Sequence, residues 1–157
     1  MPTLDDVYRK FGEAAEAAQL LETQLGNMLL LSRGAEHGLF TEPNAELASN
    51  LYSTINRRTL GQLIKDMDST PQSLDTLESL LSNALQERNR FFHSFYRHHN
   101  FRRNSEEGRA LMLNDLESIH DALLRAYKAV MLLSGVDLDA LVDSGVEHNA
   151  LTRHVQI

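Results

Sequence analysis

The sequence predicts an all-α fold, an up-and-down bundle of three long helices with shorter helices between them. Apolar residues recur at alternating spacings of three and four over long stretches, which is the period of a helix that buries one face. No stretch shows the period-two alternation of β-branched residues that indicates a strand. The chain has 157 residues, of which 42% are hydrophobic, so one domain with a substantial core is expected, at residues 1–145.

The first long helix is expected from Leu4 to Ser32, before two glycines interrupt the pattern in "RGAEHGLF". Its apolar positions form one stripe: Leu4, Val7, Phe11, Ala14, Ala18, Leu21, Leu25 and Met28. Shorter helices are expected in "TEPNAELASNLYSTI" and "TLGQLIKDM". Thr41 and Thr59 are their expected N-caps, and Pro43 suits a first turn, where its missing N–H matters least.

The second long helix is expected after Pro71, from about Gln72 to His99, and its stripe contains a charge. Arg88 occupies a position where the spacing requires an apolar residue. The apolar members of this stripe are Leu74, Leu77, Leu81, Ala84, Phe91 and Phe95.

The third long helix is expected from Glu106 to Leu133, capped by Asn104 or Ser105. Its stripe comprises Met112, Leu116, Ile119, Leu123, Ala126, Val130 and Leu133. Gly135 is expected to end it, and "LDALVDS" adds one short helix. The tail at 146–157 has no clear pattern and is expected to be loose.

Composition excludes several classes of protein. There is no cysteine, which excludes disulfides, thiolate zinc sites and a thiol nucleophile. The beginning "MPTLDDVYRKF" lacks the apolar run of a secretory signal, and no stretch approaches the roughly 20 apolar residues of a membrane span. A cytoplasmic protein without a membrane partner is expected. No nucleophile elbow and no Gly-rich phosphate loop is present.

Charge is distributed unevenly along the chain. The net charge is −7, yet residues 88–103 contain five arginines and no acidic residue, which leaves 10 basic and 22 acidic residues elsewhere. An acidic whole argues against broad, non-specific binding of nucleic acid, but it permits one local cationic site. The same segment could instead attract the acidic surface of a partner or of a second copy.

The helix period gathers polar and aromatic residues on one side of the second long helix. At about 100° per residue, four neighbours lie within roughly 140° of Arg88: Asn89, Phe92, His93 and Tyr96. Arg90 and Arg97 are expected on the opposite side, in solvent. A charge within an apolar stripe is costly unless it is paired or faces a cleft.

This combination suits phosphodiester chemistry without a metal. The imidazole of His93 can take or give a proton near neutral pH, and the planar guanidinium of Arg88 can stabilise a phosphate in the transition state. Asn89 can orient either group, and the rings of Phe92 and Tyr96 can stack on unpaired bases. One histidine cannot be acid and base at once, so a second copy would supply the other role. In the alternative, the guanidinium of Arg88 only reaches solvent, and the ring of His93 donates a hydrogen bond to a backbone carbonyl.

The segment "RNRFFH", Arg88 to His93, resembles the R-x4-6-H signature of HEPN domains, with the polar residue that usually follows the arginine. These are small all-α domains of prokaryotic toxin–antitoxin pairs, phage defence and RNA processing. "TLGQLI" is similar to a segment found before the motif in some members. The resemblance implies a metal-independent endoribonuclease that needs no cofactor. It also implies a homodimer that joins two motifs in one cleft and cleaves RNA through the ribose 2′-hydroxyl.

Carried over to this chain, the resemblance implies that Arg88 and His93 are catalytic and that Asn89 supports them. The basic and aromatic strip around them is the expected RNA contact: Phe92, Tyr96, Arg97, His99, Arg102 and Arg103. A cognate antitoxin or regulatory protein is the expected protein partner. The alternative is a non-catalytic helical interaction protein, namely a transcriptional co-regulator, an antitoxin or an adaptor.

Other polar residues give weaker signals. His93 and His98 are five positions apart, which does not bring two ligands together on a helix, so no metal site is expected. Glu22, beside the stripe of the first helix, either pairs with Arg88 across the bundle or is a solvated glutamate. His120 is expected at the edge of the last helix.

Overall fold

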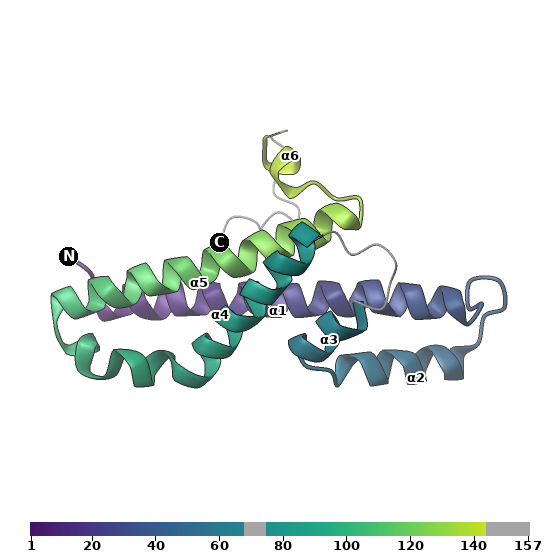
Figure 1. The fold of residues 1–157 in the computed structure, drawn as a ribbon, viewed down its shortest axis with the longest axis horizontal. Coiled ribbons are helices and arrows are strands. Elements are labelled where there is room, and N and C mark those ends of the chain that lie inside the picture. Colours follow the sequence, from purple (N-terminus) through teal and green to yellow (C-terminus); the bar gives the residue numbers. More distant parts are fainter. Residues whose placement is uncertain (68–74, 144–157) are drawn as a thin grey trace.

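The computed structural model describes residues 1–67 and 75–143, and all regular structure within them is helical (Figure 1). The all-α prediction is confirmed. The long helices are α1 (Leu4–Glu36), α4 (Asp75–His99) and α5 (Glu106–Leu133). The short ones are α2 (Ala45–Asn56), α3 (Leu60–Met67), the 3₁₀ helix η1 (Asn100–Asn104) and α6 (Leu138–Asp143). The expected helix start at Gln72 and the tail at 146–157 lie outside the described residues.

Helices α1 and α5 form the most extensive interface, and they run in the same direction (Figure 1). The hydrogen bonds between them join residues at a nearly constant offset of 107 to 110 positions: Arg109 to Pro2, Lys10 to His120 and Gln24 to Ser134. Helix α4 packs on α5 and runs back against it, while α2 and α3 pack against α1. No helix in the two described ranges is apolar over a length that could cross a membrane.

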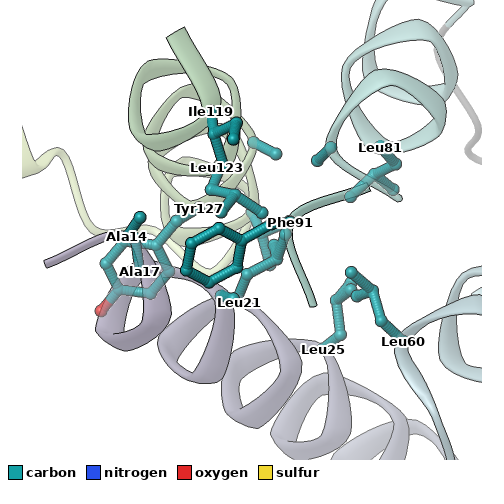
Figure 2. Packing of buried hydrophobic residues seen from close by; sticks show 14 of the residues in the cluster. Ala14, Ala17, Leu21, Leu25, Leu60, Leu81, Phe91, Ile119, Leu123 and Tyr127 are labelled. Carbon is teal, nitrogen blue, oxygen red and sulfur yellow. The ribbon is translucent and has the colours of Figure 1, made fainter. Parts of the chain in front are cut away.

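Most residues of the predicted stripes lie in the core (Figure 2), but Leu4, Phe11, Met28 and Leu77 are only partly buried, and Leu74 lies outside the described residues. Figure 2 shows Leu21 of α1 beside Phe91 of α4, and Leu25 of α1 facing Leu60 at the start of α3. The stripe of α5 is buried from Met112 to Val130, but Leu133 is largely exposed, so the prediction for that last position was wrong. Burial of this apolar surface is the main favourable contribution to folding.

The ends of the helices are set by side-chain caps. Thr3 and Asp6 form a reciprocal capping box at the start of α1, and the Ser105 hydroxyl accepts from Gly108 N–H at the start of α5. Thr59 caps α3 as predicted. Its hydroxyl accepts from the backbone N–H of Gln62, and the side-chain oxygen of Gln62 accepts from the backbone N–H of Thr59.

Two boundaries differ from the sequence prediction. Helix α1 continues four residues past Ser32, because Gly34 stays helical and is buried against Leu39 and Phe40. The cap of α2 is Asn44, whose side chain accepts from Leu47 N–H. Thr41 is not the cap, since its hydroxyl donates to the carbonyl of Gly38 instead.

Candidate functional site

Arg88 lies in the stripe of α4 between the buried residues Ala84 and Phe91, and its side chain is 22% exposed. Its Nε donates to Glu22 Oε1 of α1 at 3.0 Å, and its Nη2 lies 3.0 Å from the same oxygen. Its Nη1 donates to Asn89 Oδ1 at 3.3 Å. The ion pair with Glu22 explains how a charge is tolerated in an apolar stripe.

The guanidinium of Arg88 also lies over an aromatic ring, with its central carbon 5.1 Å from the centre of the Phe92 ring. A guanidinium offers five N–H donors, and the bonds to Glu22 and Asn89 do not use all of them. Because the group is oriented by three neighbours yet reaches solvent, it retains donors for a bound anion.

His93 is exposed on the same helix, one and a half turns after Arg88. It makes no hydrogen bond within the described part of the chain, and none joins it to Arg88. Five helical positions separate the two side chains by about 140° around the axis. One copy therefore presents the guanidinium and the imidazole on adjoining sides of α4, with Asn89 exposed nearby.

Two exposed aromatic residues lie on this side of α4 and rest on buried rings. Phe92 contacts Phe91 with ring centres 4.7 Å apart, and Tyr96 contacts Phe95 at 5.3 Å. Because their inner edges are fixed by the core, the outer faces of Phe92 and Tyr96 have defined positions from which to stack on a planar group.

The remaining residues of the predicted RNA-contacting strip divide into two groups. Arg97, Arg102 and Arg103 are exposed, and Arg103 Nη2 donates to the hydroxyl of Tyr8 at 3.0 Å. His99 is only 2% exposed and packs against Phe95, so its side chain does not reach the surface where RNA would bind. Tyr8, from the start of α1, was not predicted to be part of this surface.

A partly buried ionic network replaces the solvent contact predicted for Arg90, and that prediction was wrong. Asp115 of α5 accepts two bonds from Arg90, at 2.8 and 2.7 Å, and one from His99 Nε2 at 2.7 Å. Burial raises the pKa of Asp115, but the hydrogen bonds from Arg90 and His99 outweigh it, so the pKa is lower than usual. The network ties the C-terminal half of α4 to α5.

His120 is buried between α1 and α5 rather than at an edge, which corrects the sequence prediction. Its Nδ1 lies 3.1 Å from Lys10 Nζ, and an ammonium group can only donate, so Nδ1 is the acceptor. Its Nε2 is buried without a hydrogen-bond partner in the described part of the chain. Burial, followed by the charge of Lys10, lowers the pKa of His120, against the opposite effects of Glu13, Asp121 and Glu16.

His120 should make the protein less stable in mild acid. Because its folded pKa is below 6.5, the unfolded chain binds the proton more tightly, and stability present above pH 6.5 is lost as the pH falls. We expect the free energy of unfolding of the wild type to drop more between pH 7.5 and pH 5.5 than that of His120→Leu. Urea denaturation at both pH values measures this, and equal drops in the two proteins would contradict it.

Among the described residues, no three His, Asp or Glu side chains are arranged to hold a metal ion. Comparison with protein-family models, with curated proteins and with solved structures finds no match to this chain. The geometry and chemistry of these side chains, together with the R-x4-6-H motif that Arg88 and His93 form, are therefore the basis for a function.

The sequence pointed to Arg88 and named Glu22 as one possible partner, and the structure shows that pair; it did not point to Asp115, which holds Arg90 and His99. Asp115 lies three positions after Met112 and four before Ile119, so it follows the helical spacing of the α5 stripe. An acid at such a position, like Arg88 in the α4 stripe, is a sequence signal for a partly buried ion pair. Only the packing of the helices shows the actual pairs: Arg88 pairs with Glu22, and Asp115 pairs with Arg90.

Proposed function

We propose that this protein is a metal-independent endoribonuclease of the HEPN type, active as a homodimer. The observation that carries the proposal is the oriented, partly open guanidinium of Arg88, which shares α4 with the solvent-exposed imidazole of His93. The exposed rings of Phe92 and Tyr96 and the exposed arginines after them add a surface suited to a single-stranded polyanion.

In the proposed reaction, a ribose 2′-oxygen attacks the adjacent phosphorus while the bond to the 5′-oxygen of the next nucleotide breaks. The neutral His93 of one copy takes the 2′-hydroxyl proton, and the protonated His93 of the second copy gives a proton to the leaving 5′-oxygen. Arg88 stabilises the charge that develops on the phosphoryl oxygens. The products are a 2′,3′-cyclic phosphate, which can open to a terminal 3′-phosphate, and a 5′-hydroxyl.

The division of roles is the reason for proposing two copies. One chain offers a single R-x4-6-H histidine, and that imidazole cannot be deprotonated and protonated in the same step. A second copy that places its α4 against the first would supply the other imidazole and a second guanidinium. A cognate antitoxin or regulatory protein would control such an enzyme by covering the same surface.

His93→Ala should lower the rate of RNA cleavage in EDTA by about 10²- to 10⁴-fold, the usual contribution of a general acid or base. The assay uses single-stranded RNA and wild-type protein as reference. His98→Ala is the matched control, because His98 is also exposed near the end of α4 but lies outside the motif. Cleavage that survives His93→Ala unchanged, with both variants folded by circular dichroism, would refute the catalytic role.

The ion pair with Glu22 also favours a second candidate function, a non-catalytic interaction protein. In that case Arg88 serves to join α4 to α1. The exposed arginines Arg97, Arg102 and Arg103 would then bind an acidic partner, or would bind RNA without cleaving it. The wild type would then show no cleavage at any enzyme concentration, and overexpression would not slow growth. Arg88→Ala would lower the melting temperature without removing any activity.

A further inference from the structure

The turn between α4 and α5 holds a phenylalanine ring out in water. Phe101 of η1 is 76% exposed, and among the large apolar side chains that the structure describes only Met1 is more exposed. A ring left in solvent at this level contributes almost nothing to the core. Its position is therefore better explained by something outside the chain than by the fold.

The backbone under this ring is tightly fixed. Asn100 has a φ of 45°, a conformation that is uncommon for residues other than glycine. Gly108, at the start of α5, approaches the turn so closely that an added Cβ would lie 2.0 Å from the carbonyl oxygen of Arg102. Arg109 Nη1 donates to the carbonyl of Arg103 at 3.2 Å, and its Nε donates to the carbonyl of Pro2 at 2.7 Å.

Side chains also fix the turn from the α4 side. The buried ring of His99 donates from Nε2 to Asp115, and its Nδ1 accepts from Arg102 Nη1 at 3.2 Å. Arg103 is held by the hydroxyl of Tyr8. Phe101 thus projects from a turn that is anchored on both sides, which limits the ordering entropy that a ligand would have to overcome.

The surroundings of Phe101 indicate what the ring contacts. Its neighbours in η1, Asn100, Arg102, Arg103 and Asn104, are polar and exposed, and no acidic residue occurs between Arg88 and Ser105. Phe101 is the only apolar residue of η1, whereas a protein interface needs a wider buried centre. A single ring flanked by guanidinium groups suits a flat base with phosphates on either side.

We propose that Phe101 is a stacking platform for one unpaired base of single-stranded RNA, with Arg102 and Arg103 contacting the phosphates beside it. This inference rests on the proposed RNA substrate, and it adds a binding subsite separate from the motif. Phe101 lies in the η1 turn beyond the end of α4, whereas His93 lies six residues before that end, roughly 9 Å along the helix axis, so the subsite would hold the strand away from the scissile bond. Phe101 is a binding residue and takes no part in proton transfer.

Phe101→Ala should weaken RNA binding by roughly 5- to 150-fold, the range expected for loss of one base–aromatic stack. The probe is a fluorescein-labelled 12-mer with 2′-O-methyl groups throughout, which cannot be cleaved through a 2′-hydroxyl. Fluorescence anisotropy gives its dissociation constant. Phe101→Trp should bind as tightly as the wild type or more tightly, because it keeps an aromatic face.

Phe40→Ala is the matched control, because Phe40 is 67% exposed in the turn after α1, which lacks the cluster of arginines. It should leave the dissociation constant unchanged. Equal affinity of wild type and Phe101→Ala would overturn the subsite while leaving the proposed nuclease intact. The subsite would also be overturned if Phe101→Ala changed the oligomeric state, or the capture of an acidic protein, without changing RNA binding. A wild type that binds the probe through Phe101 but cleaves no RNA would support the subsite and refute the nuclease, and a wild type that binds no RNA would overturn both.

Discussion

Gly108→Ala should destabilise the protein by about 3 kcal/mol, which corresponds to a fall in melting temperature of roughly 10 °C for a domain of this size. The added methyl would lie 2.0 Å from the carbonyl oxygen and 2.7 Å from the carbonyl carbon of Arg102. Both are backbone atoms, so no side chain can rotate away to make room. Either the η1 turn must move from the start of α5, or the first turn of α5 must unwind.

Gly12→Ala provides the matched control for this substitution. Gly12 lies within α1, is exposed, and has no atom within 4 Å of an added Cβ. Alanine favours the helix over glycine by about 1 kcal/mol, so this variant should melt slightly above the wild type. Differential scanning calorimetry of the three proteins measures both effects. A Gly108→Ala protein that melts within about 2 °C of the wild type would show that the turn is not held by this contact.

Asp115→Ala should cost about 3 kcal/mol through loss of the acceptor shared by two side chains. Arg90 would retain only Glu87, and the buried His99 would lose the acceptor for its Nε2 proton. Leaving a buried donor without a partner is more damaging than losing an exposed ion pair. Because His99 also contacts Arg102, we expect the η1 turn to lose protection against hydrogen exchange in this variant.

Asp139→Ala is the control for Asp115→Ala. Its carboxylate pairs with Lys128 at the surface and is 71% exposed, so its removal should change stability by less than about 1 kcal/mol. The two variants should also differ in acid. The lowered pKa of Asp115 contributes stability that is present above pH 3.8 and is lost as the pH falls below that value. Urea titrations at pH 7 and pH 3 measure the free energy of unfolding of wild type and of Asp115→Ala. The same difference between the two proteins at both pH values would contradict this contribution of Asp115.

Much of the fold could be predicted because apolar spacing reports burial directly. Most of the residues in the stripes of α1, α4 and α5 lie in the core, and Ser105, Thr59 and Gly135 mark helix ends as expected. The η1 turn was not foreseen, because it depends on the close approach of Gly108 to a backbone six residues earlier, which has no periodic signal. Thr41 and Asn44 are both residue types that cap helices, and in the structure the hydroxyl of Thr41 bonds the Gly38 carbonyl while Asn44 caps α2.

The polar residues were harder to place than the apolar ones. Helical angles put Arg90 opposite Arg88, which is correct, but angles alone do not say whether a neighbouring helix covers that side. Helix α5 does cover it, and Asp115 supplies the counter-charge. The burial of His120 has the same origin, since α1 lies over it with Lys10 at hydrogen-bonding distance.

The parallel pairing of α1 with α5 has a consequence for how the chain folds. The largest interface of the protein joins residues that are more than 100 positions apart in the sequence. In a simple bundle of helical hairpins, by contrast, short loops connect the helices that pack together. Loop-closure entropy delays such distant contacts. During synthesis, α2 and α3 can pack on α1 early, but the part of α1 that packs on α5 stays exposed until α5 has left the ribosome, so the nascent chain is most prone to aggregation over that interval.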